Sequence, residues 1–391
     1  MLKNEKSVVL HQGVYKQTAT VSEAVFMITG MTIGAGILGL PYVVAQVGLI
    51  IGLIYILVLG LVVMMLNLII GEIAVRTKEN FQIPGFAGRY LGCWAKRLMS
   101  LIIILTGYGA LLAYIIGEGE ALSAMFGGDK VWWSICFWSI GSILIWRGLQ
   151  TVKNVEKILS MVVIGLIVGL SLFLLDKFHP ANFFYTDLTK LFLPYGVILF
   201  ALNATPAIAE AHALLPGSQK HFRKAIIIGG LIPIGVYLLF VLAVVGFLGV
   251  NTTEIATVGL NHQFGGWVYA CANLFAALAM GTGFLGIGIA LKQSLIWDHK
   301  INRYLAEFAV ISVPVILFLF GFRSFVSILD VIGGLFIGIE AVLLVAIAYK
   351  ARKKGDLDAS RYGLNNFWLV AIPVLLFFSA ASIYTVVKLF H

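Results

Sequence analysis

The chain has 391 residues, of which 60% are hydrophobic and 12% are charged, and its mean hydropathy is +1.00. Soluble domains contain about 45–50% apolar and 25% charged residues, so this composition excludes a soluble globular protein and indicates a polytopic membrane protein. The net charge is +9, and we expect the excess to lie in cytoplasmic loops and not to form a nucleic-acid-binding surface.

The N-terminal stretch, residues 1–21, is polar and mixed in charge. It lacks the apolar core that precedes the cleavage site of a secretory signal peptide, so we expect a cytoplasmic segment. The three cysteines, Cys93, Cys136 and Cys271, are scattered along the chain. Their spacing predicts neither a disulfide framework nor a metal cluster.

Eleven apolar runs are long enough to cross a bilayer as helices, for which about 20 residues suffice. They cover residues 22–45, 47–75, 98–125, 131–147, 156–176, 190–213, 225–249, 265–291, 304–322, 325–349 and 366–389. With a cytoplasmic N-terminus, 22 of the 27 Lys and Arg residues fall on the inner side, as the positive-inside rule requires. The sequence therefore predicts an all-α integral membrane protein with eleven transmembrane helices, the N-terminus inside and the C-terminus outside.

The first run contains a dense group of helix-breaking residues, Gly30, Gly34, Gly36, Gly39 and Pro41. Each glycine disfavours a helix interior by about 1 kcal/mol relative to alanine. Close helix packing through small residues is one interpretation. Non-helical backbone at membrane depth is tolerated where protein buries it or where it lines a cavity. We therefore favour the interpretation that this helix is broken at a transport site.

The sixth run carries a second break signal, because Pro206 deletes a helical donor in mid-membrane and Asn203 and Thr205 lie beside it. Five plus five helices of opposite orientation would place the first and the sixth helix at corresponding positions, as in transporters with inverted repeats. The expected units are a first five-helix repeat at residues 22–176, an inverted second repeat at residues 190–349 and an extra helix at residues 366–389.

Four sequence blocks resemble one family of transporters. Residues 30–41, GMTIGAGILGLP, resemble the first-helix signature of bacterial hydroxy/aromatic amino acid permeases and the GxGILGLPY opening of the wider amino acid/auxin permease family. Residues 108–114 with the following Gly117, Gly119 and Glu120, residues 193–200 and residues 282–286 are similar to the third, sixth and eighth helices of the tyrosine permeases. The resemblance implies a leucine-transporter-type fold within the amino acid-polyamine-organocation superfamily. It also implies secondary amino acid transport, usually proton-coupled and in some relatives sodium-coupled.

Two positions depart from the family pattern. Asn203 stands where many members have a histidine, so a proton-handling histidine is missing there. Gly283 stands where the family commonly has a serine beside Thr282. In sodium-coupled relatives, this pair of hydroxyls forms the sodium site together with first-helix carbonyls. The glycine argues against sodium coupling but leaves it open, because water or carbonyl oxygens can complete such a site.

The unwound backbone of the first helix is the expected site for the amine and carboxylate of a substrate. Half-helix N-termini favour a carboxylate, and the carbonyls of broken ends suit an ammonium group. Tyr108 and Tyr114 lie about 120° apart on their helix, and the resemblance favours Tyr114. The predicted substrate-binding residues are Thr32, Ile33, Gly34, Ala35, Gly36, Tyr114, Phe200, Ala201, Leu202, Asn203 and Thr282.

Ionisable residues inside membrane spans are treated as functional candidates. For ion coupling we expect, in this order, Glu340, Asp330 and Glu120, with Thr282 as a candidate for a bound cation. Glu72 lies one turn before Arg76, which predicts a structural ion pair. Lys157 is the single candidate for the helix-five lysine that replaces the ion in some relatives, and its position at a helix end favours a loop-anchoring role.

No catalytic, metal-binding or phosphate-binding motif is recognisable, so we expect neither an enzyme nor a cofactor beyond a coupling ion. The sequence predicts a secondary active permease of the inner or plasma membrane that imports a neutral amino acid by proton symport and alternating access. Sodium symport is the second expectation. Small residues at Ala201, Ala204 and Gly283 favour an aromatic or branched substrate. An uncoupled exchanger and an amino acid-sensing receptor on the same scaffold are the alternatives.

Overall fold

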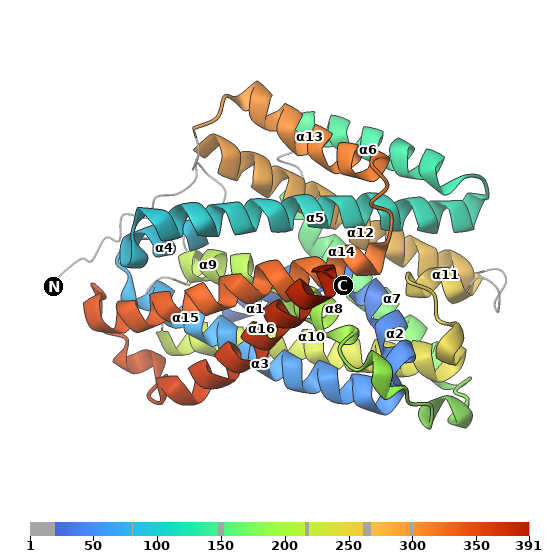
Figure 1. The fold of residues 1–391 in the computed structure, drawn as a ribbon, viewed down its shortest axis with the longest axis horizontal. Coiled ribbons are helices and arrows are strands. Elements are labelled where there is room, and N and C mark those ends of the chain that lie inside the picture. The colour runs from blue at the N-terminus through green and yellow to red at the C-terminus, as the bar shows by residue number, and fades with distance from the viewer. Residues whose placement is uncertain are drawn as a thin grey trace.

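A computed structural model describes residues 20–79, 81–147, 152–215, 219–260, 267–297 and 300–390. Its regular structure in these ranges is helical, and the long helices lie side by side in one bundle (Figure 1). The helices are α1 (Val21–Thr32), α2 (Gly36–Val47), α3 (Leu49–Arg76), α4 (Ile83–Leu91), α5 (Cys93–Phe126), α6 (Lys130–Arg147), α7 (Val152–Leu175), α8 (Pro194–Leu202), α9 (Thr205–Leu214), α10 (Gln219–Leu248), α11 (Ala256–Leu260), α12 (Trp267–Trp297), α13 (Arg303–Leu319), α14 (Phe325–Val331), α15 (Ile337–Lys354) and α16 (Phe367–Phe390).

Each of the eleven predicted apolar runs coincides with one helix or with consecutive helices. The first run forms α1 and α2, the sixth forms α8 and α9, and the tenth forms α14 and α15, joined by a π-helical turn at Ile332–Phe336. Among the described residues, six helices are long and apolar enough to cross a membrane, or seven if the bent pair α1–α2 counts as one span. The predicted N-terminal segment lies, up to residue 19, outside the described residues.

Two short helices were not predicted. Helix α4 lies between α3 and α5 and buries Ile83, Phe86 and Ala87 against α5 and α15. It begins with Pro84 in its first turn, where a missing N–H costs nothing. Helix α11 has only five residues. Both are shorter than a membrane-spanning run, so apolar runs of that length do not predict them.

The broken pairs occupy the centre of the bundle. Helices α2 and α8 pack against each other and against α3, and α2 also packs against α10. Nearly every residue of α2 and all but Phe200 of α8 are buried. An apolar helix that is buried all round belongs in the interior of a bundle, so the surrounding helices form the scaffold for the two pairs.

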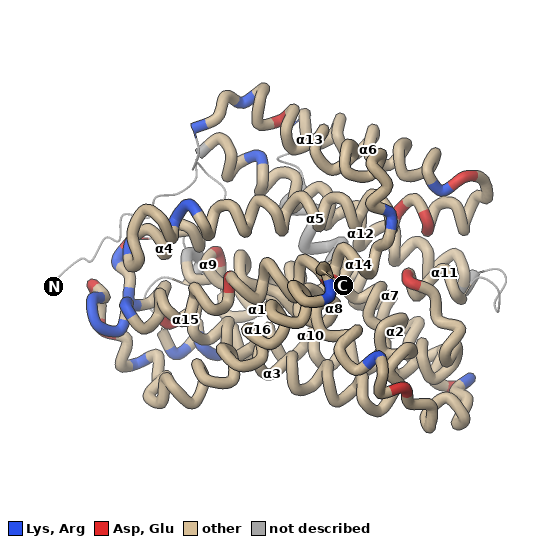
Figure 2. Tube along the Cα trace, viewed as in Figure 1, with Lys and Arg blue, Asp and Glu red and all other residues tan. Residues whose placement is uncertain are grey.

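Lys and Arg residues gather at the end of the molecule that contains α4 and the C-terminus of α15, at the left of Figure 2. Glu72, near the end of α3, pairs there with Arg76 (2.9 Å) and with Arg352 of α15 (2.8 Å). The predicted Glu72–Arg76 pair is therefore confirmed, and Arg352 extends it into a link between two helices.

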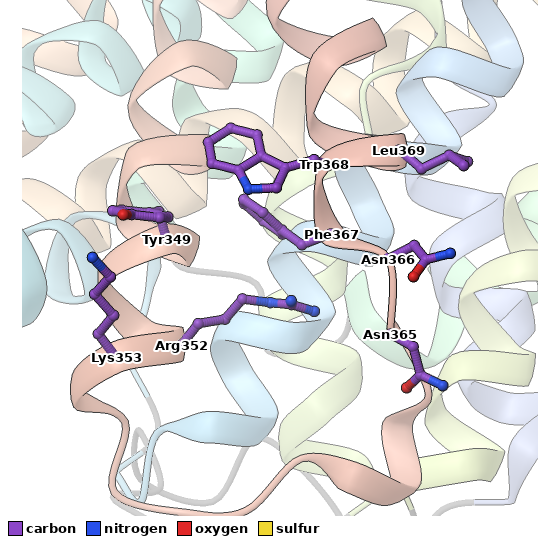
Figure 3. Close-up of a pocket in the computed structure, with 8 residues that line it drawn as sticks. All are labelled: Tyr349, Arg352, Lys353, Asn365, Asn366, Phe367, Trp368 and Leu369. Atoms are coloured by element: carbon purple, nitrogen blue, oxygen red, sulfur yellow. The ribbon is translucent and has the colours of Figure 1, made fainter.

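An open cleft of about 490 Å³ lies at the same end, between the last turns of α15 and the start of α16 (Figure 3). It is lined by Tyr349, Arg352, Lys353, Asn365, Asn366, Phe367, Trp368 and Leu369. Aromatic and basic side chains therefore share one depression at the surface of the bundle.

Candidate functional site

The first break is centred on Gly34. Helix α1 ends at Thr32 and α2 begins at Gly36, and the two axes are bent by 56°. The N–H of Gly34 donates to the carbonyl of Thr32 (2.9 Å) and not to the carbonyl four residues back. Pro41 lies inside α2, which stays helical, so the predicted interruption is confined to residues 33–35.

The second break is held by Asn203. Helix α8 ends at Leu202 and α9 begins at Thr205. The Asn203 side-chain carbonyl accepts hydrogen bonds from the backbone N–H (3.1 Å) and the hydroxyl (2.7 Å) of Thr205. The carbonyl of Leu202 cannot receive a helical bond from position 206, because Pro206 has no N–H. The Asn203 side chain therefore binds the first N–H of α9 from the position before the N-cap residue, Ala204.

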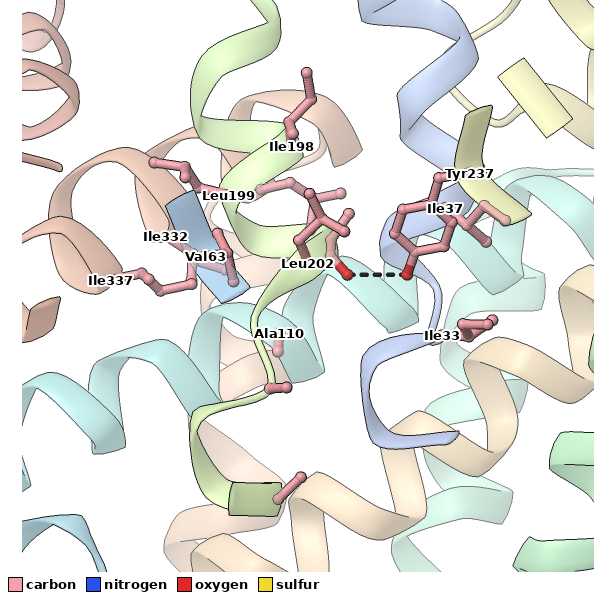
Figure 4. Close-up of a cluster of buried hydrophobic side chains, with 14 of the residues drawn as sticks. Ile33, Ile37, Val63, Ala110, Ile198, Leu199, Leu202, Tyr237, Ile332 and Ile337 are labelled. Carbon is pink, nitrogen blue, oxygen red and sulfur yellow. Dashed lines mark hydrogen bonds between the residues drawn. The ribbon is translucent and has the colours of Figure 1, made fainter. Parts of the chain in front are cut away.

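The two breaks contact each other directly. A Cβ atom on Gly36 would lie 2.7 Å from the Cα of Ala201, so only glycine permits this approach. Between the two segments lies the hydroxyl of Tyr237 from α10, 2.7 Å from the carbonyl oxygen of Thr32 and 2.9 Å from that of Ala201 (Figure 4). Tyr237 is fully buried and ties the C-terminal ends of α1 and α8 together.

Sequence analysis missed Tyr237. A single tyrosine in an apolar helix carries no local signal, since tyrosines in helix bundles commonly serve as hydrogen-bonded packing residues. Its partners are backbone carbonyls about 36 and 205 residues away. These carbonyls become available as acceptors only because both helices end at the same place.

Tyr114 of α5 also reaches the first break. A Cβ atom on Gly34 would be 3.8 Å from the Tyr114 hydroxyl, and a Cβ atom on Gly283 of α12 would be 2.9 Å from its ring. The structure thus brings together two predicted residues, Gly34 and Tyr114, and places Gly283, the neighbour of Thr282, against the Tyr114 ring. The Tyr114 ring occupies the space that a side chain at position 283 would need.

The hydroxyls of the two predicted threonines are directed to their own helices. Thr32 Oγ1 donates to the carbonyl of Ile28 (2.7 Å), and Thr282 Oγ1 donates to the carbonyl of Leu278 (2.7 Å). Each oxygen retains lone pairs as an acceptor. The predicted residues also differ in exposure. The buried ones include Ile33, Ala35, Gly36, Ala201 and Leu202, and the partly accessible ones are Gly34, Phe200, Asn203 and Thr282.

A small cavity of about 10 Å³ adjoins both breaks on the α3 side. Its lining residues are Thr32, Gly60, Val63, Met64, Asn67, Leu202 and Gly230. Asn67 is 2% exposed, and its Oδ1 accepts no hydrogen bond within the described part of the chain. Buried polar atoms are normally satisfied, so Asn67 marks a polar point beside the breaks. An amide within the apolar run at residues 47–75 was the signal that sequence analysis overlooked.

The acidic candidates differ in their partners. Asp330 pairs with Lys388 (2.7 Å) and Glu120 with Lys130 (3.3 Å). Glu340 is 3% exposed, and its carboxyl forms no hydrogen bond or ion pair in the described ranges. Glu118 of α5 is also buried, and its Oε2 has no partner among those residues. The side chain of Lys157 lies outside the described residues.

The structure shows no group of three His, Cys, Asp or Glu side chains that would hold a metal ion, within the residues it describes. The site is therefore built from backbone ends, glycines and single polar side chains.

Comparisons with known proteins agree with one another. A profile of the tryptophan/tyrosine permease family matches residues 17–383. Tyrosine-specific transport system 1 of Haemophilus influenzae is 26% identical over 379 residues, covering 89% of this chain and 92% of that protein. Glutamine transporter 2 of Aliivibrio fischeri is 24% identical over 348 residues, covering 84% of this chain and 88% of that protein.

Two solved structures share the fold. The crystal structure of MhsT in complex with L-phenylalanine has a TM-score of 0.67 at 14% identity and covers 94% of this chain and 99% of that one. A manganese transporter of Eremococcus coleocola also has a TM-score of 0.67, at 13% identity, over 97% of this chain and 92% of that one. At this level of identity the likeness concerns the fold alone.

Proposed function

The chain belongs to the tryptophan/tyrosine permease family, and we propose that it imports a large neutral amino acid by proton symport with alternating access. As a member, it is a multi-pass protein of the cell membrane and an amino acid transporter, not an enzyme. The finer architecture belongs to the proposal: eleven transmembrane helices in two inverted five-helix repeats, residues 22–176 and 190–349, followed by the helix at 366–389. The clustering of Lys and Arg at one end supports a cytoplasmic N-terminus (Figure 2).

The observation that carries the proposal is the contact between two broken helices in the centre of the bundle. The N-terminus of α2 carries partial positive charge toward the break, and the ends of α1 and α8 present carbonyl oxygens there. A zwitterionic amino acid can place its carboxylate at the N-terminus of α2 and its ammonium group at the carbonyl oxygens of α1 and α8. Transporters with inverted repeats bind their substrates at such interrupted helices.

The substrate class rests on the family and not on the small residues of the site. Ala201 is packed against Gly36, and the space beside Gly283 is filled by Tyr114. These small residues therefore serve close packing in this conformation and do not by themselves favour a large side chain. Relatives named for tyrosine and for glutamine make tyrosine the first substrate to test and glutamine the second.

Two observations support protons over sodium as the coupling ion. A serine at position 283, which would supply the second hydroxyl of a sodium site, would collide with the Tyr114 ring. Glu340 is a buried carboxyl with no cation beside it among the described side chains, whereas Asp330 and Glu120 are neutralised by Lys388 and Lys130. An unpaired carboxyl inside a membrane bundle is expected to bind a proton.

The test is uptake of radiolabelled tyrosine, tryptophan, glutamine, leucine and serine into proteoliposomes under a proton gradient or a sodium gradient. We expect accumulation of tyrosine with the proton gradient alone. Glu340→Gln should abolish this accumulation but retain tyrosine counterflow, because exchange of bound substrate needs no net proton movement. Glu118→Gln, which changes the other buried carboxyl, should retain accumulation.

Three results would overturn parts of the proposal. Accumulation that requires sodium would exclude proton symport. Loss of coupling in Glu118→Gln but not in Glu340→Gln would move the proton site to α5. Substrate binding without counterflow would exclude transport and favour a receptor.

A further inference from the structure

The cleft at the ends of α15 and α16 has the composition of an anion site at a membrane surface. Its walls are the rings of Tyr349, Phe367 and Trp368, with the Tyr349 and Trp368 ring centroids 5.8 Å apart (Figure 3). The basic side chains of Arg352 and Lys353 line it from α15. Aromatic residues at the membrane interface and basic residues beside them are typical of contact with lipid headgroups.

The two basic side chains have different roles. Arg352 is committed to the protein, because its guanidinium pairs with Glu72 (2.8 Å), donates to the carbonyl of Leu364 and lies 4.7 Å from the centroid of the Phe367 ring. Lys353 is exposed, and its Nζ lies 4.3 Å from the centroid of the Tyr349 ring. No carboxylate pairs with Lys353 in the ranges that the structure describes.

The acidic residues of the adjoining loop have other partners. Asp356 pairs with Arg89 (2.7 Å), and this guanidinium lowers the pKa of the Asp356 carboxyl, which stays ionised and bound to Arg89. Asp358 accepts hydrogen bonds from the backbone N–H and the hydroxyl of Ser360. The charge of Lys353 is therefore available to a ligand.

Helix α16 adds a second source of positive potential. It is 24 residues long, begins at Phe367 in the wall of the cleft and has no acidic residue in its first turn. The N–H groups of a first helical turn lack intrahelical acceptors and attract anions. A phosphate in the cleft would therefore face both Lys353 and the start of α16.

An exposed apolar stripe leads from the cleft along α16. Trp368 (53% exposed), Ile372 (49%) and Leu376 (65%) are spaced by one helical turn, and Leu369 (68%) borders them at the cleft. Because residues four apart lie on one face of a helix, the stripe provides a surface for an acyl chain directly below the anion site.

We propose that this cleft binds an anionic phospholipid, with its phosphate at Lys353 and the N-terminus of α16 and one acyl chain along the α16 stripe. Charge complementarity and the continuity of the cleft with the apolar stripe favour a lipid over a soluble anion. The inference does not depend on the transported substrate, since the cleft is lined by α15 and α16 at the basic end of the bundle, away from the breaks.

The test is native mass spectrometry of the purified full chain, titrated with phosphatidylglycerol or, as the neutral comparison, phosphatidylcholine. We expect preferential retention of one phosphatidylglycerol. Lys353→Gln should weaken its binding about fivefold, the effect of one lysine near an anionic lipid surface. Trp368→Ala should weaken binding of both lipids. Lys354→Gln removes the same charge from the adjacent position outside the cleft and should bind as the unchanged chain does.

Equal retention of the two lipids, or equal loss in Lys353→Gln and Lys354→Gln, would overturn the proposal. Displacement of phosphatidylglycerol by millimolar inorganic phosphate would show that a soluble anion is the ligand and would overturn the lipid assignment. Tyrosine counterflow of each variant, measured in parallel, separates this result from the proposed transport function.

Discussion

At the scale of single residues, glycines determine how closely the site is assembled. Gly36 permits the contact with Ala201, and Gly283 permits the position of the Tyr114 ring. The sequence indicated that the first-helix glycines matter, because their density is incompatible with an ordinary helix. It did not indicate which glycine breaks the helix and which packs, since that depends on the neighbour. Gly39, for example, stays helical and packs against Phe325.

Gly36→Ala is expected to destabilise the protein by about 1–3 kcal/mol, because its Cβ would lie 2.7 Å from a backbone atom of Ala201 that cannot rotate away. Thermal unfolding and tyrosine uptake of the purified variant measure this effect, and both should be reduced. Gly235→Ala in α10 is the matched control, since a Cβ there meets nothing within 4 Å. A loss of similar size in both variants would show that the close approach of Gly36 to Ala201 is unimportant.

At the scale of elements, the two helix breaks differ in how far the residues next to them in the sequence determine them. The second is largely encoded in its own sequence, because Pro206 removes a donor and the Asn203 side chain accepts a hydrogen bond from the first N–H of α9. The first depends on long-range contacts with α8 and α10, which a single sequence does not reveal. The same limit explains why Tyr237 was missed, whereas the neighbouring ion pair Glu72–Arg76 was predicted from its spacing of one turn.

Tyr237→Phe should destabilise the protein by about 1–3 kcal/mol, because two buried carbonyls lose the hydroxyl that lies between them. We also expect slower tyrosine exchange, since the ends of α1 and α8 would no longer be held together. Tyr55→Phe is the control, because the Tyr55 hydroxyl forms no hydrogen bond within the described residues. Unchanged unfolding and exchange in Tyr237→Phe would refute the role of this bridge.

At the scale of the whole molecule, the two halves of the broken first helix differ in accessibility. In α1, which lies toward the basic end (Figure 1), Phe26 is 45% exposed and Met31 is 41% exposed. On the other side of the break, α2 is buried almost throughout. Alternating access predicts such asymmetry for a state in which the site communicates with one face of the membrane.

A cysteine at Met31 should therefore react with a membrane-impermeant maleimide that is added on the side of the basic end. Val43 of α2 is fully buried, and a cysteine there should react at least about tenfold more slowly than one at position 31. This difference is expected if the conformation that exposes α2 is a minor population. The background chain needs Cys93, Cys136 and Cys271 replaced, because these thiols are free. Vesicles of known orientation distinguish labelling from the two membrane faces. If the N-terminus is cytoplasmic, Met31→Cys should react from the cytoplasmic face.

Saturating tyrosine should change the labelling rates of the two cysteines in opposite directions if substrate shifts the population between states. Equal labelling of Met31→Cys from both faces would contradict both the asymmetry of this conformation and the alternating exposure of the site.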